Sequence, residues 1–121
     1  MTIISQILIG AVALLHLYFL YLEMFAWTTR GPKVFRSFPK DLFVPTKTLA
    51  ANQGLYNGFL AAGLIWSLII KDHHWNVYVA IFFLSCVLIA GIYGAATVSK
   101  KIFWIQGLPA LAALISVHIV Y

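Results

Sequence analysis

Residues 75–98, with the sequence WNVYVAIFFLSCVLIAGIYGAATV, contain no charged side chain. A helix of about 20 apolar residues crosses the bilayer core, because each residue adds ~1.5 Å and the core is ~30 Å thick. Apolar segments of similar length cover about residues 3–28, 48–70 and 102–121. Backbone groups in lipid are satisfied only within helices or closed barrels, and these segments lack the alternation of barrel strands. The sequence therefore predicts an all-α polytopic membrane protein, an antiparallel bundle of four transmembrane helices forming one domain over residues 1–121.

The composition agrees with this prediction and narrows the function classes. Of the 121 residues, 63% are hydrophobic and 9% are charged, against about 25% charged in ordinary globular proteins. The formal net charge is +5, but the basic residues lie between apolar segments, so we expect anionic lipid headgroups as partners and no nucleic acid. The single Cys86 excludes an intrachain disulfide and a multi-cysteine metal site. The first apolar segment has no basic residue before it and is too long for a secretory signal, so we expect it to be a retained span.

Basic residues divide unequally between the two predicted sides of the membrane. If the chain threads back and forth, only Lys71 falls on one side, and seven of the eight basic residues fall on the other. The seven are Arg30, Lys33, Arg36, Lys40, Lys47, Lys100 and Lys101. Loops rich in Lys and Arg stay in the cytoplasm. The sequence therefore predicts a multi-pass protein of the cell membrane (the inner or cytoplasmic membrane) with both termini extracytoplasmic.

The connection over residues 29–47 is the largest segment outside the predicted spans. Its Phe35, Phe38 and Phe43 interleave with basic residues, and three prolines prevent one long helix. We expect this basic loop to lie at the membrane interface, with its rings toward the lipid and its charges toward the headgroups. The headgroup-binding side chains would be Arg30, Lys33, Arg36 and Lys40. A disordered basic linker is the alternative.

Glu23 is the only acidic residue within a predicted span. A carboxylate in a membrane helix is costly and normally faces the protein interior or a polar cavity, so Glu23 is a candidate for binding or catalysis. The alternative is that water, Lys47 or an amide satisfies it. His16 lies two helical turns earlier on the same face, ~10 Å along the axis. It is the second candidate, with helix packing as its alternative role.

The second predicted span carries four polar side chains within six residues, which are Asn52, Gln53, Tyr56 and Asn57. Gln53 and Asn57 share one face, and Asn52 and Tyr56 share the next. If the helices are antiparallel, Asn52 and Gln53 lie at the same depth as Glu23, whereas Asn57 lies deeper, near mid-membrane like His16. Trp27, Tyr93 and Gln106 also fall near this cytoplasmic layer, and the two aromatic rings could stack on a cation. We therefore expect a polar pocket open toward the cytoplasm, with interhelical hydrogen bonding as the alternative role of the amides.

Small residues recur at helical spacing in the second and third predicted spans. Gly54 and Gly58 belong to a series with a small residue at every fourth position, and Gly91 and Gly94 form a second group. Such ridges let another helix approach closely. The sequence leaves open whether these ridges pack within one chain or join copies into a homo-oligomer.

We expect no metal site and no cofactor. His73, His74 and His118 lie near the extracytoplasmic side, but no cysteine or carboxylate cluster completes a ligand set. Nucleotide-binding loops and nucleophile elbows are absent from the sequence.

Two motifs carry a resemblance to a known family. They are residues 15–24, LHLYFLYLEM, and residues 52–61, NQGLYNGFLA. With its length and four predicted spans, the chain resembles an uncharacterised bacterial family of small four-helix membrane proteins, a domain of unknown function. The resemblance implies the fold and the location but no activity. The chain is similar in size to small multidrug exporters, but its basic residues are far more one-sided, and it has one membrane acid where sterol isomerases use two.

Three function classes remain open. The leading expectation is an integral membrane protein that binds a small lipophilic or cationic molecule in the polar pocket, and whether it also transports this molecule is left open. The first alternative is a membrane-embedded enzyme acting on a lipid or isoprenoid, with Glu23 and His16 as an acid–base pair. The second alternative is a structural or accessory membrane subunit.

Overall fold

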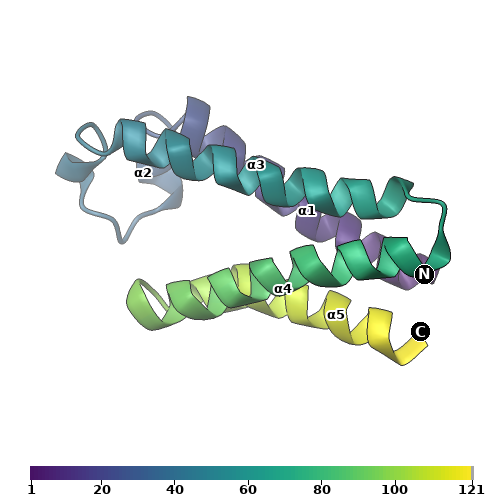
Figure 1. Cartoon of the computed structure of the whole chain (residues 1–121). Helices are drawn as coiled ribbons and strands as arrows, with labels where there is room; N and C mark the ends of the chain where they lie inside the picture. Colours follow the sequence, from purple (N-terminus) through teal and green to yellow (C-terminus); the bar gives the residue numbers. More distant parts are fainter. Residues whose placement is uncertain (121) are drawn as a thin grey trace. The chain divides into compact units, whose positions relative to one another are not determined.

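The computed structural model describes residues 1–120, with side chains described through Ile119. The described residues form helices and no strand, which confirms the predicted all-α class. The elements in chain order are α1 (Ile3–Phe25), α2 (Gly31–Val34), η1 (Lys40–Leu42), α3 (Lys47–Ile69), α4 (His73–Thr97), η2 (Phe103–Gly107) and α5 (Leu108–Val120) (Figure 1).

The helix boundaries differ from the predicted spans for local reasons. The first helix ends at Phe25 rather than near residue 28, since the N–H groups of Arg30 and Gly31 both bond to the carbonyl of Ala26 and turn the chain. The α4 helix begins at His73, two residues earlier than predicted, because Asp72 caps it. Asp72 Oδ1 accepts hydrogen bonds from the backbone N–H groups of His74 and Trp75 at 2.9 and 3.0 Å. Capping satisfies donors that have no partner within the helix.

The last predicted span is divided into two elements. Residues Phe103–Gly107 form the π-helix η2, in which the N–H of Leu108 bonds to the carbonyl of Phe103. The next residue, Pro109, has no N–H to donate and cannot continue a regular α-helical ladder. The α-helix α5 follows, and the predicted end of the span at Tyr121 lies outside the described residues.

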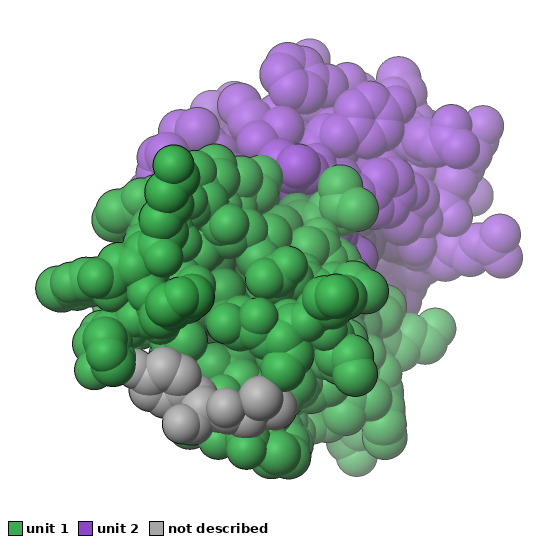
Figure 2. Space-filling view, turned by 90° about the vertical axis from the view of Figure 1, so that its right-hand side faces the viewer, with its two compact units in different colours: residues 1–14, 60–121 green, residues 15–59 purple. Residues whose placement is uncertain are grey.

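The chain forms two compact units, shown in separate colours in Figure 2. Unit 1 contains residues 1–14 and 60–121, and unit 2 contains residues 15–59. The helices α1 and α3 contribute one end to each unit.

Unit 1 has the larger apolar core. Its buried side chains come from α1, α3, α4 and α5 and include Ile9, Leu64, Leu84, Val87 and Ala113. The α4 helix lies beside η2 and α5 (Figure 1). The approach is close at Gly91, where an added Cβ would lie 2.7 Å from the Cα and the nitrogen of Gly107. Ser5 and Ser116 also join across this unit, with their hydroxyl oxygens 3.0 Å apart.

Unit 2 folds the basic connection around an aromatic cluster. The ring of Trp27 packs against Phe35, Phe38 and Phe43, with ring centroids 5.5, 5.7 and 4.8 Å away. Its indole N–H donates to Thr46 Oγ1 at 3.0 Å. Phe43 is buried in this cluster, whereas Phe35 and Phe38 are half-buried, so the position of the connection at the membrane interface stays a prediction. The disordered alternative is wrong, since α2 and η1 form within the connection.

Two of the described helices, α1 and α4, are long and apolar enough to cross a membrane. The α3 helix matches α1 in length but carries Lys47 and three amide side chains, which lower its hydropathy. Residues Phe103–Ile119 form a shorter apolar helix.

Candidate functional site

The carboxylate of Glu23 is the centre of a polar site inside unit 2. Glu23 lies within the last turn of α1 and is only 5% exposed. Its Oε2 accepts a hydrogen bond from Gln53 Nε2 at 2.6 Å, and its Oε1 accepts one from Asn57 Nδ2 at 2.5 Å. Both donors come from α3, so one carboxylate joins the two helices. We call Glu23, Gln53 and Asn57 the carboxylate–amide triad.

Two glycines of α3 allow α1 to come this close. A Cβ added at Gly54 would lie 2.7 Å from Met24 Cγ, 3.0 Å from Glu23 Cβ and 3.2 Å from the Leu20 carbonyl oxygen. At Gly58, an added Cβ would lie 2.7 Å from Leu20 Cδ1. Since residue 54 contacts residues 23 and 24 while residue 58 contacts residue 20, the two helices are antiparallel within unit 2. Gln53 and Asn57 flank this glycine face and so reach the carboxylate from one side.

In unit 1, Gly91 and Gly94 likewise allow α4 to approach a neighbouring segment closely. Gly91 approaches Gly107, and an added Cβ at Gly94 would lie 2.8 Å from Ile102 Cγ2. Both glycine ridges therefore contact other segments of the same chain. A homo-oligomer formed through them would require these contacts to open.

The chemistry of the triad follows from its donors. Amide N–H groups stabilise a carboxylate without cancelling its charge, and a hydrogen bond to a charged group contributes about 1.5–3 kcal/mol. The sequence left water, Lys47 or an amide as possible hydrogen-bond partners of Glu23. In the structure each of its two carboxylate oxygens accepts a hydrogen bond from an amide of α3. The site therefore combines an enclosed acid with neutral donors, and its charge is available to a cation or a proton.

His16 lies in unit 2, two turns before Glu23 in the unbroken helix α1. Its side chain is fully buried, and its ring packs edge-on against Phe19 with centroids 5.5 Å apart. The rise of an α-helix separates it from Glu23 by ~10 Å along the axis. This separation is too long for direct proton transfer between the two side chains.

Other candidate residues of unit 2 lie apart from the triad. Asn52 and Tyr56 are exposed on the neighbouring face of α3, and the Tyr56 ring packs against Phe59. Trp27 belongs to the aromatic cluster, where three phenylalanine rings surround its own ring. Sequence reasoning missed this cluster, and the only signal for it was the proximity of aromatic residues along the chain.

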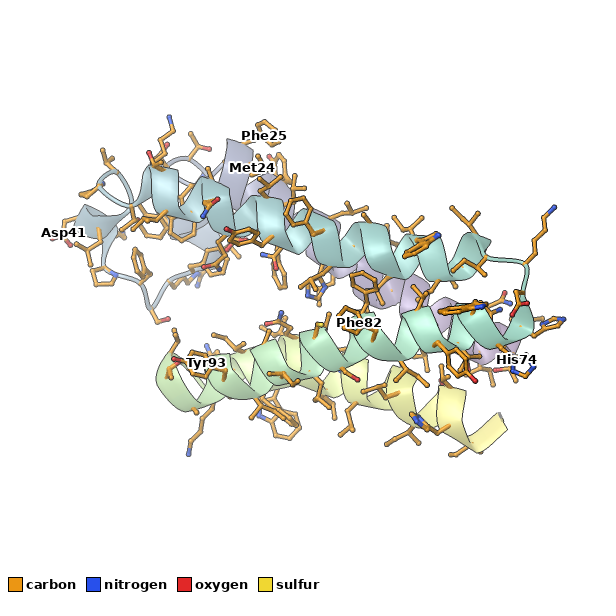
Figure 3. All side chains as sticks on the ribbon, in the orientation of Figure 1. Met24, Phe25, Asp41, His74, Phe82 and Tyr93 are labelled. Atoms are coloured by element: carbon orange, nitrogen blue, oxygen red, sulfur yellow. The ribbon has the colours of Figure 1, made fainter. Side chains whose placement is uncertain are left out.

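Tyr93 and Gln106 belong to unit 1. Tyr93 projects from α4 and is 71% exposed, and its backbone carbonyl accepts a bond from Thr97 Oγ1 (Figure 3). Gln106 lies in η2, where its backbone carbonyl carbon is near the face of Gly91. Among the described residues, no group of three His, Cys, Asp or Glu side chains is placed to hold a metal ion.

Comparisons with known proteins give one family. The family model described as "Protein of unknown function (DUF1304)" matches residues 10–118. The uncharacterized protein YpaA of Lactococcus lactis subsp. lactis (strain IL1403) is 37% identical over 118 residues, which cover 96% of this chain and 98% of that protein. No solved structure matches the chain. These matches confirm the resemblance to an uncharacterised family.

Proposed function

The chain belongs to the DUF1304 family of proteins of unknown function, and we propose that it is an integral membrane protein that binds a small lipophilic cation at the carboxylate–amide triad. Four segments cross the bilayer in this proposal: α1, α3, α4, and η2 together with α5. Movement of the bound cation across the membrane is the extended form of the same proposal.

The apolar surface supports membrane insertion. In the most apolar windows of α1 and α4, only 28% and 22% of the residues are buried inside the protein. A core helix of a water-soluble protein would bury most of this surface, and soluble proteins rarely expose large contiguous apolar patches. Large side chains such as Ile3, Phe25 and Ile89 are among the exposed residues. Lipid is the solvent that such a surface fits.

The basic residues support an orientation. Arg30, Lys33, Arg36 and Lys40 are all exposed around the aromatic cluster of unit 2. Under four-span threading they lie on the same side as Lys100 and Lys101, which the positive-inside tendency assigns to the cytoplasm. Both termini are then extracytoplasmic. The four exposed cations of unit 2 also suit anionic headgroups, each contributing about 1 kcal/mol near such a surface.

The observation that carries the proposed binding is the pairing of both Glu23 oxygens with amides. A buried carboxylate that keeps a net charge attracts a cation strongly, because the surrounding dielectric constant is low. Gln53 is exposed although it touches the enclosed acid, so a ligand that displaces its amide would reach Oε2 without unfolding the helix. A lipophilic cation fits best, since the apolar side chains of Leu20 and Met24 lie beside Glu23 against the glycine face of α3.

The same hydrogen bonds favour a second candidate, a structural role. Each oxygen of the carboxylate already has a donor, and Gly54 holds α1 close to α3. In this case the triad fixes the helix pair and binds no ligand. The two candidates differ in what happens when the charge of Glu23 is removed.

Equilibrium binding of tetraphenylphosphonium to the full chain in phosphatidylcholine nanodiscs tests the proposal. We expect Glu23→Gln to weaken tetraphenylphosphonium binding at least about tenfold. The substitution removes the negative charge while keeping a side chain of similar shape. A tenfold loss of affinity corresponds to about 1.4 kcal/mol, and the loss of one charge pair at low dielectric constant exceeds this energy. Asp41→Asn is the matched control, since it removes one acidic charge from the exposed η1 segment, and it should bind like the native protein. Unchanged affinity in Glu23→Gln would overturn the binding proposal and favour the structural role.

A further inference from the structure

A shallow groove lies on the surface of unit 1, between the end of α4 and η2. Its volume is about 440 Å³. The lining residues are Ile92, Ala95, Ala96, Lys100, Phe103 and Trp104. None of them belongs to the carboxylate–amide triad.

The groove results from an alternation of small and large side chains. Close approaches at Gly91 and Gly94 bring the last two turns of α4 against Gly107 and Ile102. Ala95 and Ala96 present only methyl groups there, so they form a low floor. Phe103 and Trp104, packed edge to face with centroids 5.8 Å apart, form a tall aromatic wall on the other side. The depression is therefore apolar and suited to a hydrocarbon chain.

One end of the groove is cationic. Lys100 is its only charged lining residue and lies in the turn after α4, next to the exposed Lys101. The sequence contains no acidic residue after Asp72, so no carboxylate within α4, η2 or α5 neutralises this end. A ligand that matches the groove must combine a negative head with an apolar tail.

We propose that this groove binds one anionic phospholipid, with the phosphate at Lys100 and an acyl chain along Ala95, Ala96 and Trp104. The tryptophan suits this position, because indole rings prefer the level of the headgroups in a bilayer. A free phosphate ion matches the groove less well, since a single exposed lysine faces an otherwise apolar lining. The inference rests on the membrane insertion proposed above and does not depend on the ligand of Glu23.

Native mass spectrometry of the full chain tests this site. The protein is released from nanodiscs that contain equal amounts of dioleoylphosphatidylglycerol and dioleoylphosphatidylcholine, which share acyl chains and differ in head charge. We expect one retained phosphatidylglycerol in the native protein. Lys100→Gln should lower its retention about fivefold, the ratio that corresponds to about 1 kcal/mol for a specific exposed ion pair.

Matched variants separate the groove from general attraction. Lys101→Gln makes the same charge change one residue away and should retain the lipid like the native protein. Ala96→Phe fills the floor and should also lower retention, whereas Ala90→Phe, on the exposed face of the same helix outside the groove, should not. Equal retention of the two lipids by the native protein, or equal losses in Lys100→Gln and Lys101→Gln, would overturn the inference.

Failure of this inference is distinguishable from failure of the proposed function. Vesicle flotation of the native protein reports membrane insertion alone, and Glu23→Gln should retain phosphatidylglycerol normally. A protein that floats with vesicles but shows no lipid preference overturns only the groove. A protein that does not float overturns the membrane proposal, and the groove with it.

Discussion

Asn57 donates its side-chain amide to Glu23 between the antiparallel segments of unit 2, with Nδ2 2.5 Å from Oε1. Gln53 makes the matching bond to the other oxygen. The acid, which would be the most costly residue of α1 in lipid, thereby becomes a link between two helices.

This link predicts a loss of stability in Asn57→Leu. Interhelical hydrogen bonds in membranes average about 0.6 kcal/mol and reach about 1.7 kcal/mol, and bonds to charged groups lie at the upper end. We expect Asn57→Leu to lower the free energy of unfolding by about 1–2 kcal/mol. Reversible unfolding in mixed detergent and SDS, followed by tryptophan fluorescence, measures it. Asn52→Leu, on the exposed face of the same helix, should cause no loss, and equal losses in both variants would contradict the assigned bond.

A double-mutant cycle isolates the charge in this bond. In a Glu23→Gln background, the acceptor is neutral and the hydrogen bond is weaker. Asn57→Leu should therefore cost less there than in the native protein, with a coupling of about 0.5–1.5 kcal/mol between the two positions. The measurement is the same unfolding assay on the four proteins. Additive losses would show that Asn57 stabilises α3 without acting through Glu23.

The close contact at Gly91 in unit 1 predicts that a change of glycine to alanine affects stability differently at Gly91 and at Gly10. A Cβ at Gly91 would lie 2.7 Å from backbone atoms of Gly107, which cannot rotate away, whereas a Cβ at Gly10 would have no neighbouring atom within 4 Å. We expect Gly91→Ala to destabilise the protein by about 1–3 kcal/mol through overpacking. Gly10→Ala should be neutral or stabilising by up to about 1 kcal/mol, since alanine favours helix. Equal effects in the unfolding assay would contradict the close approach of α4 and η2.

The cap of α4 predicts a pH dependence at the start of that helix. Hydrogen bonds from the backbone N–H groups of Trp75 and His74 hold the pKa of the Asp72 carboxyl below its ordinary value. Because the folded pKa is depressed, the stabilisation is present above the ordinary pKa and is lost as pH falls through the folded pKa. Amide protection at residues 74 and 75, measured by hydrogen exchange and corrected for intrinsic rates, should therefore decrease in acid.

Two variants control this measurement. Asp72→Asn keeps a good capping side chain but cannot titrate, so its protection should not change over the same pH range. Asp72→Ala removes the cap and should have low protection at every pH. An acid-dependent loss of protection in Asp72→Asn would assign the effect to another group.

The proposed orientation predicts which exposed positions an impermeant thiol reagent reaches. In a Cys86→Ser background, Ser37→Cys places a thiol in the basic connection, and His73→Cys places one at the start of α4, both at exposed sites. We expect labelling of position 73 in intact cells and of position 37 only after the membrane is permeabilised. Labelling of position 37 but not of position 73 in intact cells would show that the orientation is the reverse of the proposed one. Labelling of both positions in intact cells would overturn four-span threading.

The sequence was sufficient for the all-α class and for recognising Glu23 as the one acid within an apolar segment, while its role stays a prediction. Long uncharged segments such as residues 75–98 have few alternatives to helix, and the helix α4 lies there with a boundary shift of two residues at its start. Local chemistry also explains where the predicted helix boundaries were wrong. The Asp72 cap lengthens α4, and Pro109 accompanies the π-helix that divides the last segment.

The partners of Glu23 required tertiary structure. Helical periodicity places Gln53 with Asn57 and places Asn52 with Tyr56, but it does not fix the rotation of α3 about its own axis. The contacts of Gly54 with Met24 and Glu23 fix that rotation, because only the glycine face allows so close an approach. Asn52 and Tyr56 are then exposed. The chain likewise carries three phenylalanines near Trp27 in sequence, but only the fold of the connection brings their rings together.

What the sequence determined by itself is the all-α class, because length and apolarity act locally along the chain. What only the tertiary structure decided is which side of each helix meets another segment. That choice depends on side-chain shape across an interface, such as the absent Cβ of Gly54 beside Glu23, and no periodicity within one helix contains it.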